Sequence, residues 1–178
     1  APASIEWRLI VLESFAGVPG FVAAAFRHFR SLRRLERDRG FIFTLLEEAE
    51  NERMHLLVCM KMFEAGPATK ALVHAAQLGM TPLLAGVYLV HPPAMHRFVG
   101  YLEETAVETY TNLVEKTTTP GTKLHDEWQG LAAPGIAKAY WKLHDDAKWV
   151  DCLQHMLADE SHHRDVNHTF ATLPEGAP

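Results

Sequence analysis

Two short motifs in this sequence place a carboxylate and an imidazole three residues apart. Glu52 and His55 form the first, inside an acidic run that begins at Glu47, and Glu160 and His163 form the second. Residues at this spacing project from one face of an α-helix, so each pair can bind one metal ion. A single pair is weak evidence, because roughly one is expected by chance in a chain this rich in Glu and His. The chemistry therefore depends on whether further ligands accompany both pairs.

Two isolated acids supply those further ligands. Glu13 and Glu103 each lie in an apolar, helix-forming stretch; taken singly, each is more simply an exposed acid or a charge at a helix N-terminus. In chain order the sequence reads Glu, E-x-x-H, Glu, E-x-x-H on four segments, which is the ligand set of ferritin-like di-iron and di-manganese carboxylate bundles. Four buried carboxylates would be costly without a cation, and carboxylates with imidazoles suit iron or manganese. The sequence thus predicts a two-metal centre inside a four-helix bundle.

Length and composition predict one domain over residues 1–178. The 178 residues are 48% hydrophobic, enough for one sizeable core, and the net charge of −5 gives no indication of a nucleic-acid partner. Cys59 and Cys152 are too few for a disulfide scaffold and are expected to be buried free thiols in a reducing compartment. No signal or transit peptide is visible at the N-terminus. Because the sequence starts without Met, we expect a processed or trimmed chain.

The hydrophobic pattern predicts an all-α fold without strands. Ser4 is expected to cap the first helix, which bends at residues 17–20 and stops at Gly40. Residues 117–134 are expected to be irregular, because turn-forming residues gather there. The predicted bundle helices cover residues 5–39, 42–65, 92–116 and 135–170.

A long uncharged segment lies between the second and third ligand segments. Residues 71–96 contain no Asp, Glu, Lys or Arg, and their length could span a bilayer. Thr81-Pro82 and residues 91–93 interrupt the segment, so we predict a helix of about residues 69–90 lying in the membrane interface. The alternative is a buried helix of a soluble core. Six arginines within residues 27–39 form either a solvated helix face or a basic surface resting on anionic lipid.

The motifs resemble the signature boxes of a known family. Residues 51–56, 102–106 and 158–163, with Leu12-Glu13 upstream, look like those of the alternative oxidases, the cyanide-insensitive ubiquinol oxidases of mitochondria. Residues 96–102 and 166–170 extend the resemblance over nearly the whole chain. Plastid quinol oxidases share the ligand pattern, but the Asn-Glu-Arg-Met-His sequence of residues 51–55 is similar to the mitochondrial branch.

The resemblance implies a role for each of fifteen residues. It implies six iron ligands: Glu13, Glu52, His55, Glu103, Glu160 and His163. It implies a redox-active tyrosine, Tyr110, which taken alone is more simply a core tyrosine. Residues lining the quinol pocket would be Arg8, Leu12, Ala106 and Thr109. Residues that hydrogen-bond to and orient the ligands would be Asn51, His96, Trp141 and Asp159.

Two departures from the family's pattern stand out. Thr105 occupies a position in the third box where the family usually has an acid, although Glu103, the expected ligand, is present. The family's additional membrane helix, before the first bundle helix, is not in this sequence. We therefore expect a fragment in which one wall of the quinol pocket and part of the membrane surface are missing.

The expected reaction oxidises two ubiquinols and reduces one dioxygen to two waters at the two iron ions, without proton pumping. The resemblance implies a homodimer attached to one leaflet, on the matrix side of the mitochondrial inner membrane. A ferritin-like iron-storage protein, a plastid-type quinol oxidase and a structural helical membrane adaptor are the alternatives. An iron store should have a hydrophilic exterior, and an adaptor would not need six ligands in register. Sequence alone does not separate iron from manganese.

Overall fold

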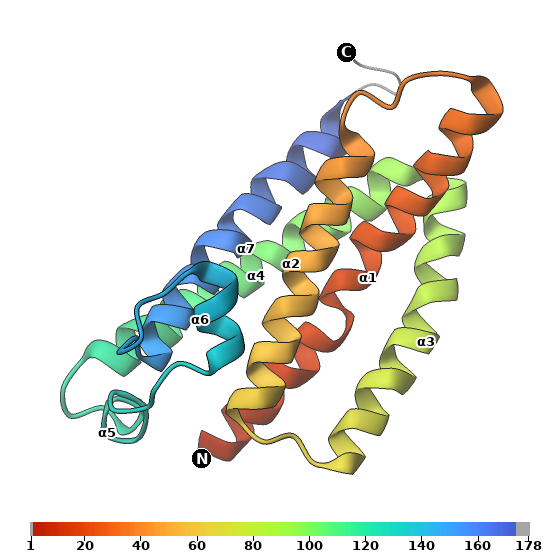
Figure 1. Ribbon diagram of the computed structural model, residues 1–178. Helices are drawn as coiled ribbons and strands as arrows, with labels where there is room; N and C mark the ends of the chain where they lie inside the picture. Colours follow the sequence, from red (N-terminus) through yellow and green to blue (C-terminus); the bar gives the residue numbers. More distant parts are fainter. Residues whose placement is uncertain (1, 174–178) are drawn as a thin grey trace.

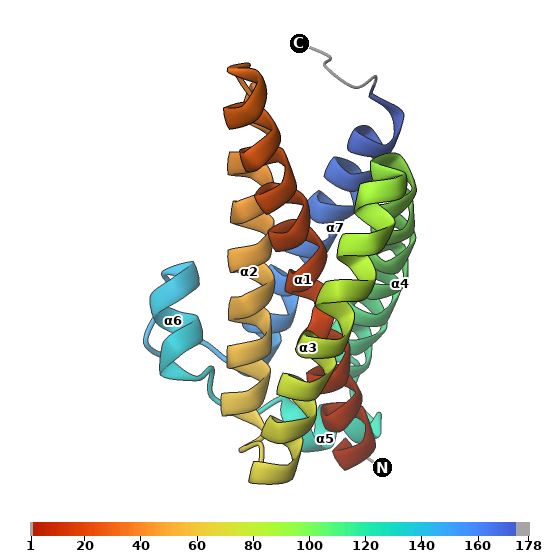
Figure 2. The same ribbon diagram turned by 90° about the vertical axis from the view of Figure 1, so that its right-hand side faces the viewer.

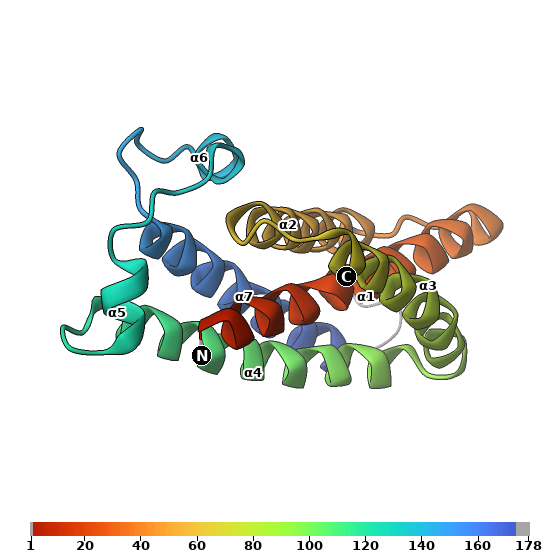
Figure 3. The same ribbon diagram turned by 90° about the horizontal axis from the view of Figure 1, so that it is seen from below.

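Four long helices form a bundle in the computed structural model, which describes residues 2–173. They are α1 (Pro2–Arg34), α2 (Phe41–Met62), α4 (Pro92–Thr118) and α7 (Trp149–Thr172). Helix α1 packs along α2 and α4 along α7 (Figure 1). A fifth long helix, α3 (Pro67–Val90), packs against α1 and α4 on the opposite side of the bundle from α6 (Gly135–Trp141) (Figures 2 and 3). The described residues contain no strand, so the all-α prediction is confirmed.

The apolar core is divided into two clusters, and each bundle helix runs from one to the other. One cluster includes Leu9, Tyr110 and Trp149, and the other includes Leu45 and Val99. Between them, each of the four helices buries an acid that the sequence marks as a candidate ligand. The core therefore provides a dry middle layer in which charged side chains have lost their contact with water.

Close approach of α1 to α2 depends on glycine. A Cβ atom at Gly20 would lie 2.8 Å from the backbone oxygen of Leu45, closer than real Cβ atoms come. Helix α1 continues through Pro19, so the predicted bend does not interrupt it. It begins at Pro2, which places Ser4 inside the first turn, and the prediction of Ser4 as its cap is wrong.

Helix α1 ends five residues earlier than predicted, because Asp38 folds the chain back. Leu35 adopts a left-handed conformation, with φ of 53°, directly after Arg34. Asp38 accepts a hydrogen bond of 2.8 Å from Arg27 and another of 2.5 Å from the Ile42 backbone N–H. One carboxylate thus binds the end of α1 and the first turn of α2, which starts after Gly40.

The predicted helix over residues 135–170 is two helices, α6 and α7. Lys142 adopts the left-handed conformation, with φ of 53°. The intervening backbone bonds to an earlier segment instead of continuing the helix: Ala133 N–H donates to Ala147 O (2.9 Å) and Trp149 N–H to Leu131 O (2.8 Å). The polar run His144-Asp145-Asp146 has no apolar face to bury, which explains why the helix breaks there.

The segment expected to be irregular contains a short helix, α5 (Lys123–Trp128). Thr122 begins it, since its hydroxyl accepts the His125 backbone N–H at 3.1 Å. Trp128 at its end is buried between Phe63 and Trp149, with ring centroids 5.7 and 6.3 Å away. Burial of one tryptophan stabilises a helix too short to form alone.

By length and composition, two helices could cross a membrane, the first within α1 and the second α3. More than half of the apolar stretch of α1 is buried, which is typical of a bundle helix. In α3, only 17% of the corresponding apolar stretch is buried. Helix α3 exposes Leu78, Leu83 and Leu89, each more than half accessible to solvent. Within this chain, the apolar surface of α3 therefore faces outward and is not buried in the core.

Candidate di-metal centre

The bundle brings the six predicted ligands into one buried cluster. They fall into two groups, and within each group the ligand atoms all lie within 4.8 Å of one another. The first group is Glu13, Glu52, His55 and Glu160, and the second is Glu52, Glu103, Glu160 and His163. Glu52 and Glu160 belong to both, so each can place one oxygen at either metal position. Two metal ions, one in each group, would share these two carboxylates.

Buried donor atoms point into the cluster without hydrogen-bond partners. They are Oε2 of Glu13, both carboxylate oxygens of Glu52 and Nδ1 of His163. The Nδ1 atom of His163 lies 2.6 Å from Oε1 of Glu52, but outside hydrogen-bonding geometry. A buried polar atom without a partner costs about 1–3 kcal/mol. Metal coordination would satisfy all four atoms, and the mixed carboxylate and imidazole donors suit iron or manganese.

The electrostatics of the cluster also call for cations. Burial raises the pKa of Glu52 to about 8 and that of Glu103 to about 7, and it raises the pKa of Glu160 well above its ordinary range. Burial disfavours the ionised form of each carboxyl group because it removes the solvating water. Four ionised carboxylates carry the charge that two divalent cations would offset. The residues present therefore fit a two-metal centre.

Asp159 contacts the imidazole of His55. Its Oδ2 atom lies 3.1 Å from Nε2 of His55 and accepts hydrogen bonds from Asn51 (2.9 Å) and from the Trp141 indole (3.0 Å). Although partial burial raises the pKa of Asp159, the hydrogen bonds from these three residues hold it below its ordinary value. An ionised Asp159 favours a proton on Nε2, which leaves Nδ1, 3.1 Å from Oε1 of Glu160, free to bind a metal. Three of the four predicted orienting residues therefore meet at one oxygen atom.

The fourth, His96, belongs to a different network beside His163. Its Nδ1 lies 3.1 Å from Oδ1 of Asn167, whose amide donates to both oxygens of Glu48 (2.9 and 3.0 Å) and to the backbone oxygen of His163 (3.1 Å). Glu48 is buried, and burial raises its pKa to about 7. Sequence reasoning missed Glu48 and Asn167. Helical spacing was the available signal, since Glu48 precedes Glu52 by four residues and Asn167 follows His163 by four.

Tyr110 contacts the cluster directly. Its hydroxyl donates a hydrogen bond of 2.6 Å to Oε1 of Glu13, while the other oxygen of Glu13 points into the metal group. Tyr110 is fully buried, and burial raises the pKa of its phenol well above the ordinary value. The side chain therefore holds its proton next to a carboxylate that can accept it.

Two of the four predicted quinol-pocket residues reach the metal cluster. Leu12 and Ala106 line a narrow cavity of about 20 Å³ that ends at Glu13, Glu103 and Glu160. This volume holds about one water molecule and no quinol ring. The other two do not line it: Arg8 is exposed, and the Thr109 hydroxyl donates to the backbone oxygen of Thr105 at 2.8 Å. Thr105 is itself exposed, so its departure from the family's pattern lies outside the cluster.

Comparison with known proteins finds relatives that match this chain over nearly its whole length. A family model described as "Alternative oxidase" matches residues 2–172. The mitochondrial alternative oxidase of Cryptococcus neoformans var. grubii is 47% identical over 169 residues, which cover 95% of this chain and 41% of the relative. That of Emericella nidulans is 49% identical over 173 residues, with 96% and 48% covered. Mitochondrial alternative oxidase 1 of Candida albicans is 47% identical over 169 residues, with 94% and 44% covered.

The chain spans less than half the length of these relatives. The match nonetheless includes all four bundle helices and both E-x-x-H motifs. The buried Glu and His cluster and the all-helical bundle agree with the di-iron centre expected of this family. By this match and by its site, the chain belongs to the alternative oxidase family.

Proposed function

We propose that this chain is the di-iron part of a ubiquinol oxidase, in which two ubiquinols are oxidised as one dioxygen is reduced to two waters. Each quinol gives up two electrons and two protons, so two quinols balance the four electrons and four protons that dioxygen takes up. The observation that carries the proposal is Tyr110, buried with its hydroxyl 2.6 Å from a carboxylate of the metal cluster. Binding and storing iron requires only the ligands, whereas oxidation of quinol needs a group such as this that can carry an electron and a proton.

The proposed ligands are the six residues of the two groups. Glu13 and His55 would bind one iron ion, Glu103 and His163 the other, and Glu52 and Glu160 both. The bound ions supply the redox chemistry by which dioxygen accepts electrons. Asp159, with Asn51 and Trp141 behind it, would keep the ring of His55 in its binding orientation. At the second metal position, His96 would help to orient His163 less directly, because it bonds to Asn167, which bonds to the backbone oxygen of His163.

Tyr110 would pass an electron and a proton together. Its phenol is neutral, so loss of an electron must be accompanied by loss of the hydroxyl proton, which Oε1 of Glu13 is placed to accept at 2.6 Å. Return of an electron and a proton from quinol would restore the hydroxyl. Burial excludes bulk water from this exchange, which keeps the proton on the two side chains.

We propose that quinol approaches through the narrow cavity between α1, α3 and α4. Leu12 and Ala106 line it, and Arg8 and Thr109 lie one helical turn further along the same faces of α1 and α4. Because the cavity holds about one water molecule, entry of a quinol ring requires α3 to move away from α1 and α4. The exposed apolar face of α3 is suited to such movement within a membrane interface.

We propose peripheral attachment to one leaflet, on the matrix side of the mitochondrial inner membrane, through α3 and the arginine-rich end of α1. The relatives are named mitochondrial, and α3 exposes its apolar residues. A homodimer is proposed as well; Phe21 on α1 and Phe43 on α2, 60% and 66% exposed, offer apolar surface for it. Tags at residues 67 and 90 that prove accessible from opposite sides of a vesicle would exclude this attachment. Light scattering in detergent would measure the dimer.

The experiment that tests the function is oxygen uptake with a soluble ubiquinol analogue. The iron-loaded chain should consume one dioxygen for every two quinols oxidised, and the iron-free chain should consume none. A ferritin-like store would instead oxidise added ferrous iron and ignore the quinol. A chain that ignores ubiquinol but oxidises plastoquinol would belong with the plastid-type oxidases. Loading with manganese in place of iron should abolish uptake if iron is the working metal.

A further inference from the structure

A polar pocket of about 230 Å³ reaches the metal cluster between α2 and α7, on the side where α6 lies (Figure 1). The candidate ligand His163 forms part of its wall. The narrow cavity beside Leu12 and Ala106 approaches the cluster from α1 and α4 instead, and its volume is only about 20 Å³. The cluster therefore has an apolar approach on one side and a wider, polar approach on the other.

The polar pocket is lined by groups that bind cations. The described residues of its wall include three acids, Glu47, Glu48 and Asp159, and two histidines, His162 and His163, but no lysine or arginine. Carboxylate and imidazole groups are ligands that suit iron. A cleft lined by negative charge also raises the local concentration of cations. The pocket is therefore suited to attract a divalent cation from solution.

These groups form a series from the surface inward. Glu47 and His162 are exposed, whereas Glu48 and His163 are each only 4% exposed. At the inner end, Nδ1 of His163 lies 2.6 Å from Oε1 of Glu52, one of the two shared carboxylates. A cation that follows this series can exchange its water ligands for protein ligands one at a time.

Two atoms of the wall residues are buried without hydrogen-bond partners. They are the amide oxygen of Asn51 and Nδ1 of His163. The amide nitrogen of Asn51 is engaged, because it donates to the Tyr140 hydroxyl (3.0 Å) and to Asp159 (2.9 Å). An amide oxygen can accept a hydrogen bond or bind a cation, but it cannot donate. The wall thus holds an oxygen ligand that the described part of the chain does not use.

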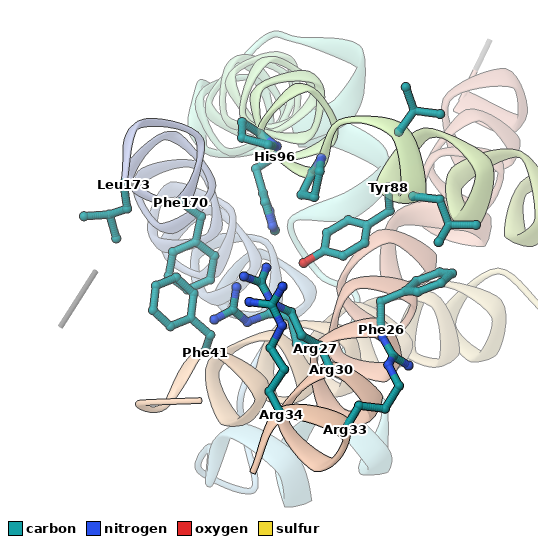
Figure 4. A pocket seen from close by; sticks show the side chains of 14 residues that line it. Phe26, Arg27, Arg30, Arg33, Arg34, Phe41, Tyr88, His96, Phe170 and Leu173 are labelled. Atoms are coloured by element: carbon teal, nitrogen blue, oxygen red, sulfur yellow. The ribbon is translucent and has the colours of Figure 1, made fainter. Parts of the chain in front are cut away.

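Two other cavities beside the bundle are unsuited to a cation. The wall of the cavity beside Leu12 is apolar except for three candidate ligands at its end, so an ion entering there would lose its water without replacement. At the end of α1, a cavity of about 430 Å³ is lined by four arginines, and the guanidinium ends of Arg27, Arg30 and Arg34 turn toward one another (Figure 4). Positive charge gathered there disfavours a cation.

We propose that the polar pocket is the route by which ferrous iron reaches the metal centre. Glu47 and His162 are its first, transient ligands. Glu48 and Asn51 follow further in, and His163 takes the ion into the cluster. Only ligand exchange occurs on this route, because each protein group replaces a water molecule of the ion and no electron is transferred. The inference rests on the two-metal centre of the proposed function and not on quinol oxidation.

The test compares rates of iron uptake in variants that keep all six proposed ligands. In the pocket variant, Glu47→Gln and His162→Gln remove both groups at the mouth. In the control variant, Glu108→Gln and His144→Gln remove one exposed acid and one exposed histidine that do not line the pocket. A third variant, Val166→Phe, narrows the pocket without changing its charge.

Uptake and release of iron are measured separately. Each chain is freed of iron and mixed with ferrous sulfate in the absence of oxygen, and uptake is stopped at intervals with an excess of ferrous chelator. Iron that remains with the protein after gel filtration gives the rate and the final content. The iron-loaded chains are then mixed with the chelator to measure release. Circular dichroism verifies that each variant is folded.

The pocket variant and Val166→Phe should take up iron about fivefold or more slowly than the original chain, and the control variant should stay within about twofold. All chains should still reach about two iron atoms, because the ligands are unchanged. Release should slow by the same factor as uptake, since a change confined to the route affects both directions equally. Added salt should slow the original chain more than the pocket variant, because it screens the charge at the mouth.

Three results would overturn the proposal. Unchanged uptake in both the pocket variant and Val166→Phe, or equal slowing in the control variant, would exclude this route and leave the metal centre intact. A lower final iron content in the pocket variant would mean that Glu47 or His162 holds bound metal instead of passing it on. An original chain that takes up no iron would refute the two-metal centre itself, and the route with it.

Discussion

The two halves of the metal centre have the same motif but different support. His55 contacts a carboxylate, that of Asp159, whose Oδ2 atom has three nitrogen partners at 2.9–3.1 Å. Nδ1 of His163 faces the candidate ligand Glu52, but its Nε2 atom has no hydrogen bond to a carboxylate within the described residues. The nearby amide of Asn167 bonds to the backbone oxygen of His163 and to Glu48 instead. Tyr110 adds to the asymmetry, because it contacts Glu13 on the His55 side.

The two E-x-x-H motifs provide the same ligands, but the groups that surround these ligands differ. The E-x-x-H spacing provides the same two ligands on each helix, because it depends only on the helical repeat. The orienting groups come from elsewhere in the chain, and they need not be alike. We expect the shared carboxylates to control both metal positions equally, and the supporting groups to control one side each.

The largest expected effect is loss of both metals when a shared carboxylate is removed. Glu52→Ala and Glu160→Ala each delete an oxygen donor from both groups, so the remaining ligands cannot complete either position. Iron content measured by absorption spectrometry should fall from about two atoms per chain to near zero. Glu104→Ala, on an exposed acid next to Glu103, is the control and should keep its iron. Full occupancy in both shared-ligand variants would refute the ligand assignment.

The second effect is loss of quinol oxidation without loss of iron. Tyr110→Phe keeps the ring in the core and removes only the hydroxyl that bonds to Glu13, so iron content should change little. Oxygen uptake with a soluble quinol should fall to the background rate at matched iron content. Tyr101→Phe, on an exposed tyrosine of the same helix, should keep full activity. If Tyr110→Phe consumes oxygen as fast as the original chain, Tyr110 is a packing residue.

Most of the ligand cluster could be predicted from the sequence, because each ligand pair is local. A helix fixes the direction of Glu52 relative to His55 whatever surrounds it, and four such helices with apolar faces can hardly bury their acids anywhere but together. The α1 and α7 boundaries were harder to predict. The end of α1 depends on the hydrogen bond between Asp38 and Arg27, and the start of α7 depends on hydrogen bonds between residues 131–133 and 147–149. Helical periodicity does not predict either set of contacts.

The residues that sequence reasoning missed are those whose role is set by distant partners. Glu48 looks like one more acid in an acidic run, beside the exposed Glu47, until the fold buries it against Asn167. The convergence of Arg27, Arg30 and Arg34 also depends on tertiary structure, since sequence spacing alone is equally typical of a solvated helix face. Burial, which decides both cases, is a property of the whole fold.

The third effect concerns pH and the His163 side alone. Burial raises the pKa of Glu48 from 4.5 to about 7, so the native state disfavours its ionised form. Stability is therefore unaffected below about pH 4.5 and is lost as pH rises toward 7, by on the order of 3 kcal/mol. Glu48→Gln removes this loss. Urea unfolding of metal-free protein at pH 5 and pH 8 should show that the free energy of unfolding of Glu48→Gln, relative to that of the original chain, is larger at pH 8 than at pH 5. Glu47→Gln should show no such gain, and a difference between Glu48→Gln and the original chain that is independent of pH would contradict the burial argument.

The smallest effect tests the His55 side alone. Asp159→Asn preserves the shape of the side chain but removes its charge, so the amide no longer favours a proton on Nε2 of His55. Loss of such a supporting carboxylate typically costs about ten- to a hundredfold in metal affinity, and we expect the lower end because Asn51 and Trp141 still surround the position. Competition with a chelator should show one of the two irons leaving more readily while the second is retained. Asp165→Asn, on an exposed acid of the same helix, is the matched control. If Asp159→Asn weakens both irons to the same extent, the two halves of the centre act as one unit, and the difference in their support has no consequence for binding.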